Sequence, residues 1–346
     1  MARDTRRRLL ALAKELEPRF RDAFVLAVRN VQSEAQLRLV TAAIAAGNVE
    51  DALRVLQIRP ETFSALELLE RAYVERGAAY QIESLPKKLQ DPAAGARLIV
   101  QFQGTQPRAS NLVFELGARL ITGITNSQRD LIAAVIAEGL EESKPPARIA
   151  RDLIGTRGAT GRRTGGIVGL TERDGLTVQR MRSALASGDP ERMRAYLRLE
   201  GRNKAWDGAV RRAIEAGEPL TARQIEQRTN HLANRYLRNR ANLIARTETI
   251  AALNAGRMEA TQQLIDRGAV RADQVTRSWD ATGDARTRLM HLQMEGQSVP
   301  WGQPFVAPDG DLLMHPGDTS LGAGGENTIG CRCYMAIKTD FLAGAI

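Results

Sequence analysis

Apolar side chains recur at three- and four-residue steps along most of the chain, the spacing of one helix face. The first run covers residues 5–46 and begins with the stripe Leu9, Leu12, Leu16 and Phe20. Gly47-Asn48 ends this run. Further helices are expected over residues 49–58, 61–85, 110–140 and 147–154, where prolines mark the ends of the runs. The pattern therefore predicts a mainly α-helical protein.

Helix-capping signals continue this picture in the second half of the chain. Thr171 is expected to cap a helix through about residue 186, and Asp189 with Pro190 begins the next one. Thr221 with Gln224 three residues later predicts a capping box at the start of a long helix that ends at Gly268.

After residue 268 the pattern changes from helical to strand-like. Residues 275–280 (VTRSWD) and 334–338 (YMAIK) are typical of strands, and residues 284–296 of a short helix. Asp309-Gly310 between two short apolar runs predicts a hairpin. We therefore expect a small C-terminal α+β module at 246–346, an N-terminal helical block at 1–90 suited to partner docking, and a basic helical middle region at 91–245.

The net charge of +9 is concentrated in the middle of the chain. Residues 141–250 contain 22 Lys or Arg and 13 Asp or Glu, and the rest of the chain is balanced. A mobile Gly/Arg-rich loop is expected at 155–169, where Arg157, Arg162 and Arg163 are candidates for non-specific contact with double-stranded DNA. The alternative is an ordinary solvated arginine surface. No Gly-rich nucleotide-binding pattern occurs.

The apolar runs are short, and the N-terminus mixes charged residues with Leu and Ala. No membrane span and no secretory signal are expected, because no stretch approaches eighteen consecutive apolar residues. The two cysteines, Cys331 and Cys333, are too few for a disulfide framework. On a strand their Cα atoms would lie ~6.6 Å apart, near the upper limit for a disulfide. We expect the pair to be reduced or metal-bound.

These cysteines, together with one histidine, suggest a structural zinc site. His291, Cys331 and Cys333 offer the nitrogen and sulfur ligands that zinc prefers, and His315 or Asp284 would complete a tetrahedron. The C-x-C spacing is tighter than that of most zinc sites. The alternative is a buried apolar cysteine pair, with His291 hydrogen-bonded to Asp284 or to a backbone carbonyl.

Several motifs of the last third occur in an order that resembles the Mu-F-like phage head morphogenesis proteins, a family of minor head proteins. They are ARTETIAALNAGRMEA, SWD, DARTRLMH, an EG pair, PFVAPDG, HPGD and GCRC. The matching positions are Arg246, Thr247, Glu248, Trp279, Asp284, Arg286, His291, Gly296, Pro316, Gly317, Asp318, Cys331, Arg332 and Cys333. The chain departs from the family's usual residues at Glu295, Thr319 and Gly330.

This resemblance implies a virion protein, made in the host cytoplasm and located inside the head or at the portal vertex. It implies portal protein, major capsid protein and packaged double-stranded DNA as partners, with roles in head assembly and DNA handling. It implies no enzyme activity, and zinc is the one cofactor that the residues themselves suggest.

Two other functions compete with this interpretation. Glu248, Asp284 and His291 are residue types that a phage-carried hydrolase or nuclease would use for acid–base chemistry. The chain could also be a stand-alone DNA-binding protein. For Arg246 we expect a structural role, in which it bridges the long helix to a backbone carbonyl or to Asp284.

Overall fold

A computed structural model describes residues 2–85, 102–158, 161 and 163–340, which form two compact units. Unit 1 consists of Met1–Arg21, Leu66–Ala118 and Asn242–Ile346, and unit 2 of Asp22–Ala65 and Arg119–Ala241. The expected regions 1–90 and 91–245 each contribute residues to both units, whereas 246–346 lies wholly within unit 1. The fold is mainly α-helical with a small C-terminal α+β module, as the sequence predicts.

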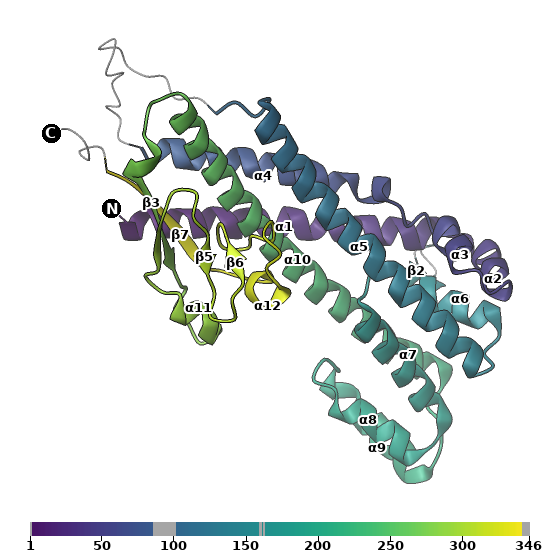
Figure 1. Ribbon diagram of the computed structural model, residues 1–346. Helices are drawn as coiled ribbons and strands as arrows, with labels where there is room; N and C mark the ends of the chain where they lie inside the picture. Colours follow the sequence, from purple (N-terminus) through teal and green to yellow (C-terminus); the bar gives the residue numbers. More distant parts are fainter. Residues whose placement is uncertain (1, 86–101, 159–160, 162, 341–346) are drawn as a thin grey trace. The chain divides into compact units, whose positions relative to one another are not determined.

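Four long helices each contribute residues to both units (Figure 1). They are α1 (Ala2–Glu34), α4 (Ser64–Glu83), α5 (Pro107–Glu141) and α10 (Ala222–Asp266). The single helix expected over 5–46 is wrong, because α1 ends at Glu34 and α2 begins at Leu37. Arg163 donates to the carbonyl of Ala35 just after α1, which satisfies a backbone acceptor that the end of the helix leaves free.

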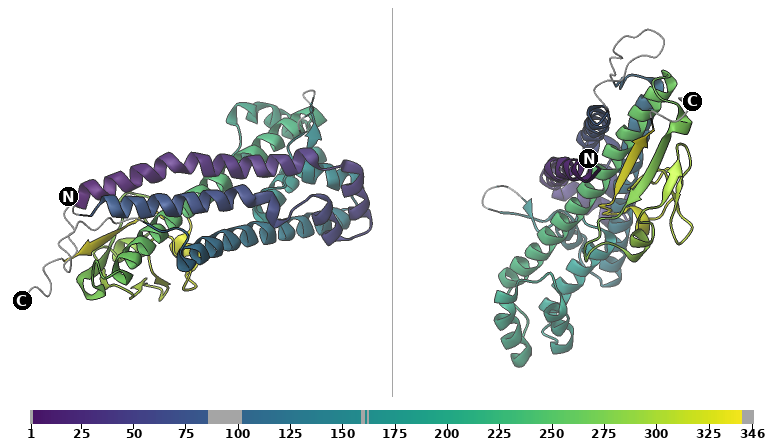
Figure 2. Two further views of the ribbon diagram at one scale, coloured as in Figure 1. Left: turned by 90° about the horizontal axis from the view of Figure 1, so that it is seen from above. Right: turned by 90° about the vertical axis from the view of Figure 1, so that its left-hand side faces the viewer.

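The apolar stripe of α1 is covered by the protein's own chain. Leu9, Leu16 and Phe20 are buried in unit 1, where the start of α1 and α4 run side by side (Figure 2). Two tyrosines of α4 fix this pair, since Tyr73 and Tyr80 donate to backbone carbonyls of α1. The apolar periodicity therefore reports an internal core, at about 1.5–3 kcal/mol for each large side chain buried.

Unit 2 consists of short helices around one two-stranded hairpin. Its own elements are α2 (Leu37–Ala45), α3 (Val49–Val55), η1 (Pro60–Phe63), α6 (Pro146–Ile154), β1 (Thr156–Arg157), β2 (Arg163–Thr164), α7 (Glu172–Ser187), α8 (Pro190–Arg198), η2 (Lys204–Trp206) and α9 (Asp207–Ala216). Thr171 and Asp189 cap α7 and α8 as predicted. The Thr221–Gln224 capping box is confirmed by reciprocal bonds of 3.1 and 3.3 Å.

The described residues of the Gly/Arg-rich segment form regular structure. β1 pairs with β2, and the following residues Ile167, Val168 and Leu170 are buried. The side chain of Gln128 accepts a bond from Gly169 N and donates one to Leu170 O. The expected mobile loop is therefore wrong for residues 163–169, because apolar side chains and a buried glutamine anchor this part.

The C-terminal module of unit 1 contains a three-stranded antiparallel sheet in the order β4-β3-β7. Its elements are η3 (Ala272–Gln274), β3 (Val275–Asp280), α11 (Leu289–Gln293), β4 (Ser298–Pro300), β5 (Phe305–Val306), β6 (Leu312–Leu313), α12 (Gly325–Thr328) and β7 (Tyr334–Thr339). Both predicted strands and the 309–310 hairpin are confirmed (Figure 1). The predicted helix over 284–296 is shorter, since only Leu289–Gln293 is α-helical.

The module's core is small and is tied to α1. Trp279, Phe305, Leu313 and Met335 form its centre together with both cysteines. At its edge, Arg6 of α1 pairs with Asp280 at 2.6 Å and donates to the carbonyls of the next two residues. No helix of the described residues is long and apolar enough to cross a membrane.

Candidate functional site

Three buried side chains of the module meet at one point, although 40 residues separate the histidine from the first cysteine. His291 comes from α11, and Cys331 and Cys333 from the segment between α12 and β7. His291 Nδ1 lies 3.7 Å from Cys331 Sγ and 3.4 Å from Cys333 Sγ. All three residues are 2% exposed. The nitrogen and sulfur atoms predicted as metal ligands are thus brought together.

The C-x-C spacing works because side chains alternate in burial along this segment. Cys331 and Cys333 both face the interior, while Arg332 between them is partly exposed. Arg332 forms a two-pronged ion pair with Asp284 at 2.5 and 2.7 Å, outside the cysteine–histidine cluster. The rings of Trp279 and His291 form a T-shaped pair, with centroids 5.4 Å apart. These neighbours fix the orientation of the cluster's residues.

The two thiols differ in acidity. The hydrogen bond that Cys331 Sγ–H donates lowers the pKa of Cys333 well below its usual value, and the contact with His291 acts in the same direction. The same hydrogen bond, together with burial, raises the pKa of Cys331. The hydrogen bonds of the cluster therefore favour loss of the proton from Cys333 over loss from Cys331.

The structure places the two candidate fourth ligands elsewhere. His315 is buried beside Asp318, and its Nδ1 lies 3.2 Å from Pro316 O. Asp284 is engaged by Arg332, whose hydrogen bonds hold the pKa of that carboxyl well below its usual range. Glu248 is also outside the group of ligand-type side chains that meets at His291 among the described residues.

Other matched positions shape the backbone of the module. Gly296 has φ +77° and donates to Trp279 O at 2.9 Å. Asn254 of α10 donates to Pro316 O at 3.2 Å, and Gly317 has φ +84° where an added Cβ would lie 3.3 Å from Ala251. The carboxylate of Asp318 accepts from two backbone amides in the same turn. These motif residues hold a tight turn against α10.

Arg246 and Asp284 are not partners. Arg246 lies 3.6 Å from Glu17 of α1 within unit 1, so the predicted bridge to Asp284 is wrong. Asp284 instead accepts from Arg286 N and pairs weakly with the Arg286 side chain at 3.5 Å. The arginine does link α10 to another element, but that element is α1.

The arginines predicted to contact DNA differ in their exposure and in their hydrogen bonds. Arg157 is exposed, with one long bond to Ser33 O at 3.4 Å. Arg163 is half-buried and donates to the carbonyls of Gly155 and Ala35, which makes it a part of the fold. Arg162 lies outside the described residues.

Much of the charge of the basic region is used internally. Arg182 pairs with Asp152 in the interior of unit 2, while Arg228 and Arg240 donate to backbone carbonyls. Burial lowers the pKa of Arg240 to about 10. The count of 22 basic residues therefore overstates the charge that a phosphate backbone can reach.

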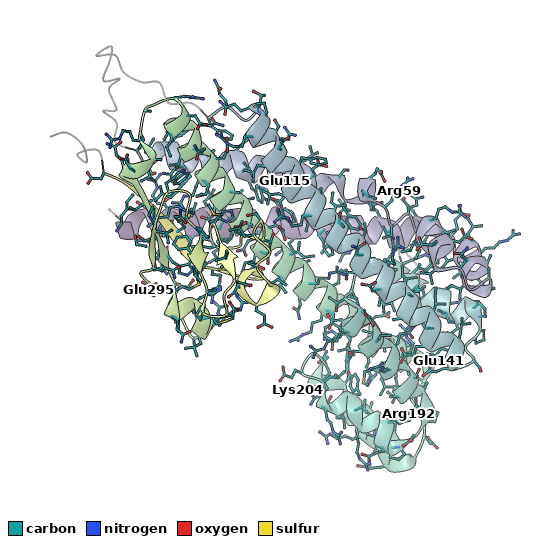
Figure 3. The ribbon with its side chains drawn as sticks, in the orientation of Figure 1. Arg59, Glu115, Glu141, Arg192, Lys204 and Glu295 are labelled. Carbon is teal, nitrogen blue, oxygen red and sulfur yellow. The ribbon has the colours of Figure 1, made fainter. Side chains whose placement is uncertain are left out.

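Exposed basic residues remain on other elements of unit 2. Arg192 and Lys204 project from α8 and η2 (Figure 3). On α10, the exposed residues Asn234, Arg235, Arg238 and Asn239 share one helix face. This face contains no acidic residue.

Comparison with known proteins identifies a family that resembles the last part of the chain. The family model described as "Phage Mu protein F like protein" matches residues 206–336. Residues 206–336 belong to the phage Mu protein F-like family. The predicted resemblance is thus confirmed for this Mu-F-like region, which contains the cysteine–histidine cluster, the Asp284–Arg332 pair and most of α10.

A named relative agrees with this membership. Minor head protein GP7 of Bacillus phage SPP1 is 27% identical over 132 residues, which are 38% of this chain and 39% of GP7. The chain therefore matches well under half the length of this relative. No solved structure matches the chain.

Sequence reasoning missed one of the fully buried cations of the Mu-F-like region, Arg277. Arg277 in β3 is fully buried and donates to the carbonyls of Met314 and Gln303, in the loops that flank the β5–β6 hairpin. Its guanidinium lies 5.5 and 5.4 Å from the ring centres of Trp301 and Phe305. The sequence did contain one indication of its burial. Side chains alternate between the two faces of a strand, which places residue 277 on the same face as Trp279.

Proposed function

We propose that this chain is a minor head protein of a tailed bacteriophage that acts in head assembly, associated with the portal and inner capsid. The observation that carries the proposal is the family match over residues 206–336, which covers α10 and the C-terminal module as far as the first half of β7. The minor head protein GP7 of phage SPP1 supports the same role. Its place of action is then the virion.

The proposed role requires no catalysis. The hydrolase alternative needs a free carboxylate near His291, but Arg332 neutralises Asp284 and the histidine faces two sulfurs instead. All three residues of the cluster are buried, which limits the access of a polymeric substrate. We therefore assign the chain a structural role.

We further propose that the protein contacts packaged DNA through its exposed middle region. The Asn–Arg face of α10 and Arg157 offer positive charge and amide groups, which suit phosphate and sugar contacts without sequence readout. Electrostatic attraction between such a surface and the DNA phosphates supplies most of the affinity of non-specific binding.

Charge reversal tests this DNA contact. We expect the Arg235→Glu/Arg238→Glu double variant to weaken binding of the full chain to random double-stranded DNA, and to reduce the slope of log K against log salt by about 2. Fluorescence anisotropy at several salt concentrations measures both effects.

Arg54→Glu/Arg129→Glu is a control with the same change in net charge. Both residues are exposed in unit 2 and belong to surface ion pairs. Equal loss in both double variants would show that only net charge matters and would refute a specific face. Tight sequence-specific binding would instead favour a stand-alone DNA-binding protein.

Partner docking by residues 1–90 needs a surface that the fold leaves open. Most of the apolar stripe is buried, so the large apolar side chains left open in this stretch are Leu26, Leu39 and Leu68, at 57%, 45% and 68% exposure among described residues. Deleting residues 1–90 would also remove Arg6, which pairs with Asp280 of the module, and part of the buried core. A deletion therefore cannot separate docking from folding.

Surface substitutions make that separation. We expect the Leu26→Ser/Leu39→Ser variant, which changes two exposed leucines of unit 2, to fold normally but to be lost at least about tenfold from purified particles, because one to two kcal/mol of binding is removed per anchor. Quantitative mass spectrometry of particles measures incorporation.

The matched control is Leu289→Ser/Leu321→Ser, which changes two exposed leucines of the Mu-F-like region. Loss of this variant alone would move the docking surface away from residues 1–90. If the unmodified chain is absent from purified heads and from complexes with portal or capsid protein, the proposed function is wrong.

A further inference from the structure

We propose that His291, Cys331 and Cys333 bind one zinc ion, and that this ion joins α11 to the segment just before β7. The three side chains form the group of ligand-type residues that the described part of the chain brings together. This site is independent of which partner the protein has in the particle.

The distances fit a tetrahedral zinc ion. With Zn–S of ~2.3 Å and Zn–N of ~2.1 Å, tetrahedral angles place a sulfur and a nitrogen ligand about 3.6 Å apart. The observed separations from His291 Nδ1 are 3.7 Å to Cys331 Sγ and 3.4 Å to Cys333 Sγ. The three ligand atoms all lie within 4.8 Å of one another. An ion therefore fits between them with little movement of the side chains.

The chemistry of the donors selects the ion. Two sulfurs and one imidazole, without a carboxylate, favour zinc over calcium, magnesium or manganese, which prefer oxygen. The alternative of an ordinary buried histidine predicts an oxygen partner for the ring. Neither ring nitrogen of His291 has one, because Nδ1 faces the sulfurs and no hydrogen-bond partner is found for Nε2 among the described residues.

The position of the site indicates what the ion would do. His291 and Cys331 are 40 residues apart, and the chain between them contains β4, β5, β6 and α12. β5 and β6 have two residues each, and the apolar core is small. Such a module gains much of its stability from a cross-link, and zinc binding to a site absent in the unfolded chain contributes directly to folding.

Three protein ligands leave a fourth position for water. An open position occurs in catalytic zinc sites, but here all three ligands are 2% exposed and Trp279 packs against the histidine. The burial favours a structural ion. Asp284 and His315 are not ligands, since Arg332 and the 315–318 turn occupy them.

Metal analysis of the full chain, purified without chelator, tests the proposal. We expect about one zinc per chain by elemental mass spectrometry, and chelation should lower the melting temperature by ~5–10 °C. Cobalt in place of zinc should give the thiolate charge-transfer and visible bands of a tetrahedral site. These bands identify the ligand atoms directly, so they remain informative even if a variant that lacks zinc is less stable.

Substitutions assign the ligands. Cys331→Ser, Cys333→Ser and His291→Asn should each lose at least about 90% of the bound zinc at equal total metal. The matched control His231→Asn changes a partly exposed histidine of unit 2 and should keep the full equivalent. Asp284→Asn should also keep it, which separates this ligand set from one completed by Asp284.

Three results would overturn the proposal. One is a chain that neither carries zinc nor takes up cobalt while both thiols titrate as free. A second is a stable Cys331–Cys333 disulfide in protein purified without chelator. The third is rapid stoichiometric alkylation of one cysteine in the native zinc-treated protein, which would indicate an accessible nucleophile instead.

Discussion

Replacing Gly256 with alanine is expected to lower the free energy of unfolding by about 3 kcal/mol. In unit 1 a Cβ at Gly256 would lie 1.9 Å from Val74 O, and one at Gly77 would lie 2.1 Å from Leu253 O. Both collisions are with helix backbone, so no side-chain rotation relieves them, and α4 and α10 must separate. The separation would also disturb Arg257, which is fully buried between the rings of Tyr80 and Tyr334.

Denaturant unfolding followed by tryptophan fluorescence measures this effect. Trp279 and Trp301 report on unit 1, and a Trp206→Phe background removes the signal of unit 2. The control is Gly123→Ala on α5 in unit 2, where an added Cβ meets nothing within 4 Å, and it is measured in the parent background that retains Trp206. It should stabilise the protein by up to about 1 kcal/mol, because alanine favours the helix. Equal stability of Gly256→Ala and the parent would contradict the close helix contact.

Replacing Arg277 with methionine is expected to cost about 3–5 kcal/mol. The guanidinium donates to the carbonyls of Met314 and Gln303, and each carbonyl left without a partner costs about 1–3 kcal/mol. Burial lowers the pKa of Arg277 to about 10, so the side chain remains a cation at neutral pH. Methionine retains most of the apolar volume beside the two rings and removes both the donors and the positive charge.

Two further variants separate this role from the effect of charge alone. Arg277→Lys should recover only part of the lost stability, because a single ammonium group cannot replace a planar fork that reaches two acceptors. Arg271→Met removes an exposed arginine paired with Asp273 in the same unit and should leave the melting temperature unchanged. If Arg277→Met melts like the parent, the carbonyls do not depend on the arginine.

The sequence by itself determined the features that depend on near neighbours. Helices followed from apolar spacing, and the caps at Thr171, Asp189 and Thr221 followed from short side chains that bond amides two or three residues on. The 309–310 hairpin followed from turn chemistry. Family membership also came from sequence, because the order of several short motifs is itself linear information.

Only the tertiary structure decided which distant side chains meet. It brought His291 to the cysteines across 40 residues and gave Asp284 to Arg332 rather than to Arg246. It also turned arginines such as Arg240 into internal donors, and it covered the stripe of α1 with the protein's own chain. Periodicity marks a face as apolar and composition counts charges, but neither contains the packing geometry that selects a partner. Those partners are set by how α1, α4 and α10 pack and by how the short strands close.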